Sequence, residues 1–503
     1  MHLSKGVKYS SLYDLVESIL RFEVDNELFG IRIKQEPFWD YLRYSLFVDI
    51  LAEPAGFRRG KGRIHGKNLR EFGQFVWMRF CTLFRKQRQY DILLVSYAPP
   101  RYIDGKKADI YMWPIARILS CKYRVLLLHL SETPINKKDY PCDIVMGRPT
   151  TLFNRLRSLF VSFKKHERNV FASLRHRLNK DLGVDVDVAK LAREVFAFQI
   201  ICQKYFLKFL EEVRPRLVLY LDSGNMKGMI KAANQLEITN VVVQHALMSP
   251  LNPLYRYHAE VPESEISETL PDYILTFGEF WNHEFMLPRE TIAVGFPYYE
   301  NTVSQYRQKR RNNDGKSILI ASVPLPKKEL ARIGVELASL LPDHTIYYKL
   351  RREEYQDWRA HYPREFSTTP NLKVIDSVDQ SIYEYFFICD YVISTNSTAL
   401  YEGLSLGLLA FILRTGRYEE VRPLFEGEYA FLVETADDIA EKIRAKAAAP
   451  NQLDRNALFK DNSEENLQNV ISRLMNRRSA GPWRIDREQR EGGRVSTRAE
   501  AQH

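Results

Sequence analysis

Residues 390–413 read DYVISTNSTALYEGLSLGLLAFIL and carry the pattern that decides the fold. An apolar run at 390–395 gives way to a hydroxyl-rich loop, then to helical spacing over 398–406, then to a second apolar run at 408–413. Short apolar runs bounded by turn residues are typical of buried parallel strands, and a helix between two of them makes a βαβ unit. The stretch therefore predicts a doubly wound α/β sheet.

Apolar runs of the same kind recur along the chain, separated by stretches with helical spacing. A first series of strands is predicted at residues 91–98, 123–130, 216–225 and 239–246. A second series is predicted at residues 271–280, 291–297, 316–324, 344–350, 371–376, 390–395 and 408–413. This alternation of strand and helix indicates βαβ units, so we predict two Rossmann-like, doubly wound α/β domains in tandem.

The two series set the predicted domain boundaries. Residues 1–88 show apolar spacing of three and four residues without strand alternation, which predicts a helical N-terminal region. The first α/β domain is expected at 89–268 and the second at 269–475. The remaining residues, 476–503, are rich in Arg, Glu and Gly and poor in apolar side chains, so we expect a disordered tail.

Composition restricts the class of protein. The chain has 503 residues, of which 45% are hydrophobic, and this suits a soluble protein with a large core. No run of about 18 apolar residues occurs, which argues against an integral membrane protein, and we expect no targeting segment. The cysteines are far apart, so neither a zinc site nor a disulfide framework is indicated, and we expect inert thiols in a reducing cytosol: Cys81, Cys121, Cys142, Cys202 and Cys389.

The net charge of +10 is concentrated in one segment. Residues 58–88 hold ten Lys or Arg side chains against one acid, Glu71, and a second basic and apolar stripe covers 152–168. Both stripes suit an anionic membrane surface, where each basic side chain contributes about 1 kcal/mol. The alternative is that both pack on the protein with their charges in water. Nucleic-acid binding is not favoured, because no recognition motif accompanies the charge.

The loop within the opening stretch is the strongest candidate for a ligand site, because open α/β sheets bind ligands at the carboxyl ends of their strands. Free amides at a helix start, together with hydroxyl side chains, can bind a phosphate or diphosphate, and a glutamate nearby can reach ribose hydroxyls. The candidate donor-binding residues here are Ser394, Thr395, Asn396, Ser397, Thr398 and Glu402. A plain helix N-cap would use the same residues, and both interpretations stay open.

This hydroxyl-rich turn, followed by Glu402-Gly403 and a Gly-bearing apolar strand, resembles the donor site of GT-B glycosyltransferases from bacterial capsule and surface-polysaccharide pathways. The resemblance is to sialyltransferase-like and Kdo-transferase-like proteins and, more distantly, to CDP-glycerol glycerophosphotransferases. Further segments match in the expected order: PFWDYLRYSLF (37–47), RYIDGKKADIYMWPIARIL (101–119), VVVQHA (241–246), PDYILTFGEF (271–280), VGFP (294–297) and IYYKLRREEY (346–355). The resemblance covers roughly residues 10–445 and implies a GT-B fold, with two domains facing a cleft.

Two positions depart from the family pattern. The family's Lys-x-His-Pro strand end faces the nucleotide phosphate in sialyltransferase-like members, whereas Lys349 here is followed by Arg351 and Arg352. Arginines can clamp a diphosphate, so we expect Lys349, Arg351 and Arg352 to bind the donor with a changed preference. Ala246 stands where the family has Gly after Gln-His. These departures would also suit a non-catalytic copy.

A glycosyl transfer needs positioned substrates, a base for the acceptor hydroxyl and compensation of the leaving charge. The candidate bases are Asp104 first, Asp222 second and His245 third, although each aspartate can also cap a loop and the histidine can serve as hydrogen-bonded structure. Arg101 and Gln244 are the expected acceptor-binding residues. No convincing DxD motif is present, so we expect a metal-independent enzyme without a cofactor.

These residues predict a glycosyltransferase that passes a sugar from a nucleotide-sugar donor to a lipid-linked bacterial surface polysaccharide. We expect it to be cytoplasmic and peripheral on the inner membrane, held to that anionic surface by residues 58–88 and 152–168. A polyol-phosphate transferase of the teichoic-acid type is one alternative, and it would leave a phosphodiester and release CMP. The other is a non-catalytic scaffold subunit of a polysaccharide assembly complex.

Overall fold

The computed structural model describes residues 9, 11–52, 89–98, 101–103, 106–130, 142–146, 156–221, 224, 226–252, 255–284, 287–306, 315–324, 327–377 and 379–476. The basic segment at 58–88, the tail beyond Asn476, and the candidate bases Asp104 and Asp222 lie outside the described residues. Within the described residues, no helix has the length and apolar character needed to span a bilayer.

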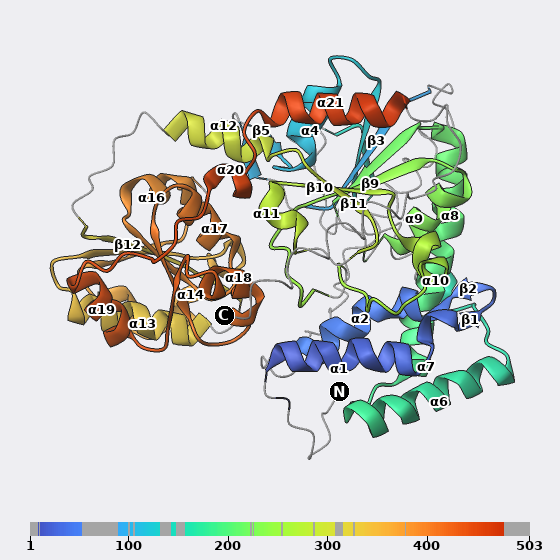
Figure 1. Cartoon of the computed structure of the whole chain (residues 1–503), viewed down its shortest axis with the longest axis horizontal. Coiled ribbons are helices and arrows are strands. Elements are labelled where there is room, and N and C mark those ends of the chain that lie inside the picture. The colour runs from blue at the N-terminus through green and yellow to red at the C-terminus, as the bar shows by residue number, and fades with distance from the viewer. Residues whose placement is uncertain are drawn as a thin grey trace, which may run out of the picture.

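Seven parallel strands form the first sheet, in the order β11-β10-β9-β8-β3-β6-β7 (Figure 1). Their bounds are β3 (Ile92–Ser96), β6 (Val125–Leu130), β7 (Ile144–Met146), β8 (Leu217–Tyr220), β9 (Thr239–Val243), β10 (Tyr273–Thr276) and β11 (Glu290–Ala293). Strands β3, β8 and β10 are buried along their whole length, as expected of strands with helices on both faces. One face packs on α4 (Met112–Leu119) and α21 (Ser463–Asn476), and the other on α8 (Ala197–Val213) and α9 (Lys227–Gln235).

The structure corrects the predicted boundary between the domains. The sequence pattern assigns β10 and β11 to the second series of strands, but β10 pairs in parallel with β9, and β11 pairs with β10. Both strands therefore complete the first sheet. The helix α21 also returns to the first domain, where it contacts α4. A short apolar run does not specify which sheet it joins, because pairing partners are chosen by tertiary packing.

Six parallel strands form the second sheet, in the order β14-β13-β12-β15-β16-β17. Their bounds are β12 (Ser317–Ala321), β13 (Thr345–Lys349), β14 (Leu372–Ile375), β15 (Tyr391–Ser394), β16 (Leu409–Leu413) and β17 (Phe431–Val433). Helices α13 (Lys327–Leu340) and α19 (Ala436–Arg444) pack on one face, and α16 (Ile382–Ile388) and α17 (Thr398–Ser405) on the other. Two doubly wound α/β domains in tandem are the GT-B arrangement, so the predicted fold class is confirmed.

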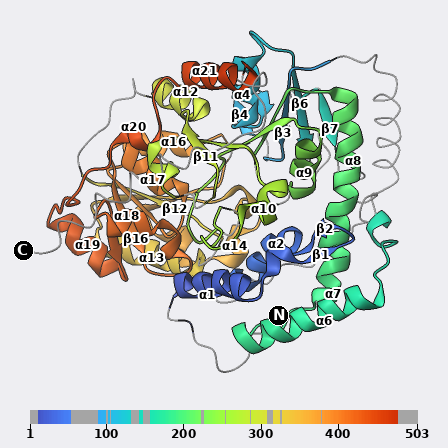
Figure 2. The same ribbon diagram turned by 45° about the vertical axis from the view of Figure 1, so that its right-hand side comes forward.

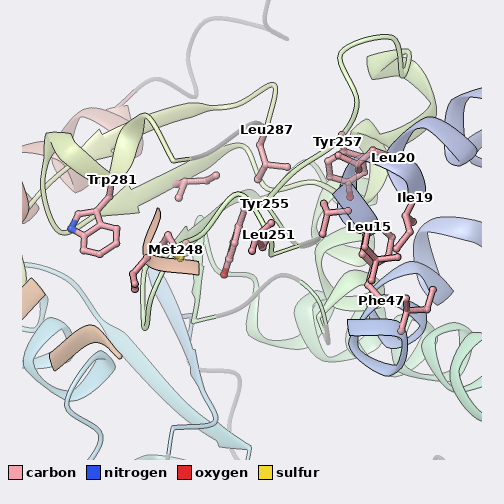
Figure 3. Packing of buried hydrophobic residues seen from close by; sticks show 14 of the residues in the cluster. Leu15, Ile19, Leu20, Phe47, Met248, Leu251, Tyr255, Tyr257, Trp281 and Leu287 are labelled. Atoms are coloured by element: carbon pink, nitrogen blue, oxygen red, sulfur yellow. The ribbon is translucent and has the colours of Figure 1, made fainter. Parts of the chain in front are cut away.

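Three helices form a separate layer beside the first domain, which we call the helical layer: α1 (Leu12–Asp25), α2 (Phe38–Ala52) and α6 (Lys165–Leu182) (Figures 1 and 2). Figure 3 shows Leu15, Ile19 and Phe47 on the side of α1 and α2 that meets Tyr257. These side chains are buried in one core cluster that continues into the second domain. Shorter elements of the structure include β1 (Arg32–Ile33), β2 (Glu36–Pro37), β4 (Arg101–Ile103), β5 (Lys106–Ala108), α7 (Val188–Leu191), α10 (Glu263–Ile266), α11 (Glu279–Asn282), α14 (Trp358–His361) and α15 (Glu365–Thr368).

A buried set of charges ties the helical layer to the first domain. The Arg43 guanidinium lies 2.6 Å (Nε) from the Glu23 carboxylate, and the Lys227 ammonium lies 3.1 Å from the Asp40 carboxylate. Tyr257 donates its hydroxyl to Asp40 at 2.8 Å. Burial alone would raise the pKa of Asp40, but the Lys227 charge and several hydrogen bonds hold it below the ordinary value. Two carboxylates and two cations therefore balance in the core.

The chain crosses between the two α/β domains twice, in α12 (Pro297–Tyr306) and in the segment from α20 (Arg455–Leu458) to α21. The two crossings are packed against each other. The Glu300 carboxylate accepts the backbone amides of Asn462 (3.0 Å) and Ser463 (2.9 Å). Gly295 has a φ of +93°, and a Cβ there would lie 2.4 Å from the Lys460 carbonyl oxygen, so the crossing requires glycine.

Candidate active site

Candidate residues follow the carboxyl ends of two strands in each sheet. In the first domain, Tyr97 follows β3 and His245 follows β9. In the second domain, Lys349 ends β13 and Ser394 ends β15. The environment of Arg101, at the start of β4, includes groups of both domains, so these strand ends meet at the domain boundary. This is the position at which open α/β sheets bind ligands.

The loop at 394–398, which we call the hydroxyl loop, joins β15 to α17. Ser394 is fully buried, and its hydroxyl donates to the Ala321 carbonyl oxygen at 2.9 Å. Ser397 is the N-cap of α17 and accepts the Ala399 amide at 3.2 Å. The N-cap interpretation of this loop is therefore correct for Ser397. Thr398, half-buried on the first turn of α17, presents its amide at the positive end of the helix.

The middle of the hydroxyl loop is held by hydrogen bonds within the protein. The buried Thr395 donates its hydroxyl to the Asn396 side-chain oxygen at 2.9 Å. The Asn396 amide donates to the Glu420 carboxylate at 2.5 Å. These side chains shape the loop, and the sequence pattern alone had assigned both of them to ligand binding.

Glu402 lies on α17 and faces the domain boundary. Its carboxylate accepts a hydrogen bond from Tyr383 of α16, and Arg101 of the first domain lies within electrostatic range. Burial raises the pKa of Glu402 to about 7, with the Arg101 charge and the Tyr383 hydroxyl acting in the opposite direction. The carboxyl group is therefore poised to change its protonation state near neutral pH.

Lys349 is a buried cation next to other cations. Burial lowers the pKa of Lys349 to about 8; Asp376 opposes this shift. The positive charges of Arg101 and Arg352 contribute to the same lowering of the pKa. The three residues Arg101, Lys349 and Arg352 form what we call the basic cluster. Like charges gathered in this way create a positive potential that favours an anion.

Lys349 is also held rigidly in place. Its ammonium donates to the Tyr355 hydroxyl at 2.7 Å and to the Ser377 carbonyl oxygen at 2.9 Å. Two of its three protons are thus directed at the protein, which leaves the remaining one to point elsewhere. The strand end therefore presents a fixed cation at the domain boundary.

The two arginines after Lys349 behave differently, although the sequence assigns both to the donor. The Arg351 Nε lies 3.3 Å from the carboxylate of Glu353, and the Arg351 amide donates to Glu354 at 2.9 Å. Arg352 is exposed and acts electrostatically on Lys349. The structure thus brings Arg352 into the basic cluster and places Arg351 in a local ion pair.

Arg101 comes from the first domain but stands among residues of the second. Its side chain is accessible to solvent. The protein around it removes part of its hydration, which opposes the charge, but the nearby Tyr111, Tyr298, Tyr383 and Glu402 raise the pKa of Arg101 above its ordinary value. We expected Arg101 to bind the acceptor, and the structure sets it beside the candidate donor residues Lys349 and Glu402.

His245 is paired with a tyrosine that the sequence analysis missed. The Tyr97 hydroxyl lies 2.9 Å from His245 Nε2. The ring of Tyr111 meets the imidazole edge-on at 6.2 Å between centroids. Tyr111 also lies within electrostatic range of Arg101 and Glu402, so it stands between the histidine and the basic cluster. Tyr97 lies near the carboxyl end of the strand predicted at 91–98, which ends at Ser96 in the structure, and that position was the available signal.

Gln244 does not have the predicted acceptor role. Its side chain is fully buried, accepts the Phe277 amide at 2.8 Å and donates to the Ala246 carbonyl oxygen at 3.3 Å. Both ends of the amide are used to join β9 to the segment after β10. A hydrogen-bonded core position explains the residue, because an unpaired amide there would be costly.

Asp109 is a buried carboxylate that the sequence analysis did not single out. It accepts the Ser96 hydroxyl at 2.5 Å and the amides of Tyr111 (2.8 Å) and Met112 (3.1 Å), and so caps α4. Burial raises the pKa of Asp109 to about 6, against these hydrogen bonds and the Arg101 charge. An aspartate just before a helical pattern was the signal for this cap.

No group of three or more His, Cys, Asp or Glu side chains in the described ranges is arranged to hold a metal ion.

No protein-family model matches the sequence, and no curated protein matches it. Solved structures with a similar arrangement include UDP-GlcNAc 2-epimerase from Methanocaldococcus jannaschii, with 13% identity and a TM-score of 0.45 over 76% of this chain and 99% of that one.

MurG from Acinetobacter baumannii matches with 11% identity and a TM-score of 0.42, over 76% of this chain and 99% of that chain. HepE from Anabaena, in complex with UDP and glucose, matches with 13% identity and a TM-score of 0.40, over 77% of this chain and 100% of that chain. Scores and identities this low transfer no function. The chemistry of this site has to be derived from its own residues.

Proposed function

We propose that the protein transfers a sugar from a nucleoside diphosphate sugar to a glycan acceptor. The observation that supports this most is the basic cluster, in which Arg101 and Arg352, from two domains, act on the buried Lys349, whose pKa is lowered to about 8 by burial first and by these two charges in addition. A diphosphate would add negative charge beside these three cations. Glu402, on the adjoining helix, is the carboxylate that would bind the ribose hydroxyls of the donor.

The chemical step follows from this placement. The acceptor hydroxyl oxygen attacks the anomeric carbon, and the bond from that carbon to the diphosphate oxygen breaks. The proton of the hydroxyl passes to His245, whose ring is oriented by Tyr97 at 2.9 Å. The negative charge that develops on the leaving diphosphate is stabilised by the basic cluster.

The acceptor in this proposal is lipid-linked, and an exposed patch near α6 supports it. Phe160 is 87% exposed, Leu159 68% and Leu156 50%, the large apolar side chains most open to water in the described part of the chain. The exposed Arg157 and Lys164 flank them. Aromatic and aliphatic side chains beside basic ones suit shallow insertion into an anionic bilayer, so the proposed location is the cytoplasmic membrane surface.

A nucleotide titration tests the donor site. Calorimetry with CMP, CDP, UDP, GDP and ADP should reveal selective binding of one nucleoside diphosphate to the wild-type protein. Arg352→Ala should weaken that binding roughly tenfold, because one charge-assisted contact to phosphate is lost. Arg351→Ala is the matched control, since Arg351 is engaged with Glu353, and it should bind as the wild type does. Equal losses in both variants, or no binding of any nucleotide, would contradict the proposal.

A vesicle assay tests the membrane part. The protein should float with vesicles of phosphatidylcholine and phosphatidylglycerol, and Phe160→Ser should reduce the bound fraction several-fold. Vesicles of phosphatidylcholine alone are the control and should bind weakly, because the basic side chains then have no anionic partner. Unchanged flotation of the variant would rule out this patch as the membrane contact.

A further inference from the structure

The amino end of α1 is capped by a residue of the second domain. Glu419, in the short helix η5 (Tyr418–Val421), accepts the backbone amides of Leu12 (3.2 Å) and Tyr13 (3.0 Å). The next amide, that of Asp14, donates to the Ser11 hydroxyl at 3.0 Å. A carboxylate in this position also interacts favourably with the helix dipole. The cap of α1 is thus built by residues at opposite ends of the chain.

Arginines from both domains hold the first turn of α1. The Arg256 guanidinium, from the first domain, lies 5.1 Å from the centroid of the Tyr13 ring. Arg422, the first residue of α18 (Arg422–Glu426), lies 4.8 Å from the same ring. The rest of α1 is bound to the first domain and the helical layer, through Arg21 to Glu260 at 3.0 Å and through the buried Glu23.

The residue after Glu419 holds the hydroxyl loop. Glu420 accepts the Asn396 side-chain amide at 2.5 Å and pairs with Arg417. The other end of the Asn396 side chain accepts the Thr395 hydroxyl at 2.9 Å. The Glu420 carboxylate is 12% exposed, so it is largely withdrawn from water and depends on these partners. The Asn396 side chain is therefore held at both ends, by Thr395 at its oxygen and by Glu420 of η5 at its amide nitrogen.

We propose that α1, η5 and Asn396 form a relay that positions the hydroxyl loop for its ligand. α1 holds η5 through Glu419, and η5 holds Asn396 through Glu420. Glu419 and Glu420 are positioning residues, because they act on the site through Asn396. The relay rests on the proposed function, because it affects affinity only if the hydroxyl loop is part of the donor site. It makes the helical layer, through α1, a determinant of donor affinity.

Hydrogen exchange of the protein without ligand tests the mechanical part. Glu419→Gln keeps the size of the side chain and removes its charge, and it should speed exchange in residues 11–16 and in residues 394–400. Glu434→Gln is the matched control, because Glu434 pairs with Arg414 (3.0 Å) in the same domain. Faster exchange at 11–16 alone, or at neither segment, would overturn the relay.

Variants of Glu420 test the order of the relay. Glu420→Ala removes the acceptor of the Asn396 amide and should speed exchange at 394–400 while α1 stays protected. Glu420→Gln keeps a side-chain oxygen for Asn396 and should restore part of that protection. Equal exchange in the two variants would show that the loop does not depend on this hydrogen bond.

Nucleotide affinity tests the functional part. UDP, CDP, GDP and ADP are the probes, and the one that binds the wild-type protein should bind Glu419→Gln about threefold to tenfold more weakly. Glu434→Gln should show no change. An unchanged affinity in Glu419→Gln would refute the functional role. If the wild-type protein binds none of these nucleotides, the proposed function fails, and the exchange experiment still decides whether the relay exists.

Discussion

The helical layer and the domain boundary each bury a cation, Arg43 and Lys349 respectively, and they surround it in opposite ways. In the helical layer, Glu23 and Arg43 lie 2.6 Å apart, and each carboxylate of the group has its own cation. At the domain boundary, Arg101, Lys349 and Arg352 share one sign, and burial has brought the pKa of Lys349 to about 8. The first arrangement is complete in the protein alone. The second gathers cations near two acids, Asp376 and Glu402, and in our proposal it also takes up an anionic ligand.

Whether a charged side chain lies beside opposite or like charges distinguishes a structural role from a ligand-binding role better than its exposure to solvent does. A buried pair can be replaced by apolar residues at little cost, but removing one member leaves an unpaired charge in the core. A cluster of like charges costs folding free energy, and natural proteins keep such a cluster where a ligand compensates for it. Substitutions in the two regions should therefore change stability in opposite directions.

The largest expected effect is in the helical layer. Arg43→Met should lower the free energy of unfolding by about 3–5 kcal/mol, because Glu23 is left buried without its cation. Urea denaturation followed by circular dichroism measures this loss. The double variant Glu23→Leu/Arg43→Met should recover much of it. If Arg43→Met is as stable as the wild type, the proposed difference between the two regions is wrong.

The next effect is a pH dependence at the domain boundary. The pKa of Glu402 is raised to about 7 in the fold, so its contribution to stability is present below about pH 4.5 and is lost as pH rises through 7. Glu402→Gln cannot ionise, and it should exceed the wild type by on the order of 2 kcal/mol at pH 8 and match it at pH 4.

Urea denaturation at the two pH values measures this difference. Glu441→Gln, at an exposed position on α19, is the control and should follow the wild type at both. A Glu402→Gln variant that loses stability at pH 8 would mean that the carboxylate is stabilising and that the boundary resembles the helical layer.

The smallest effect is within the basic cluster. Arg352→Ala removes a like charge and should raise the pKa of Lys349 above its value of about 8 by roughly half a unit, or about 0.7 kcal/mol. NMR titration of protein labelled with ¹³C-lysine measures it. Arg351→Ala should leave the pKa of Lys349 unchanged. Equal changes in the two variants would remove the distinction between the arginines.

Local patterns predicted the strands and the positions that follow them, because a parallel strand buried on both faces is a continuous apolar run. Glu402 was singled out in this way, whereas Lys349 was singled out through the family resemblance of residues 346–355. The pattern could not separate Arg351 from Arg352, because that depends on which one rotates toward Glu353. It also could not place Gln244 in the core, since the partner of its side chain lies beyond the next strand.

The return of α21 to the first domain constrains how the protein is made. Leu467 and Ile471 fill the same apolar cluster as Ile115 and Leu119 of α4. They follow the whole second domain in the chain, so a ribosome releases the first domain with that face uncovered. A chain that stops within the second domain therefore carries a bare apolar surface, which chaperones and proteases can recognise.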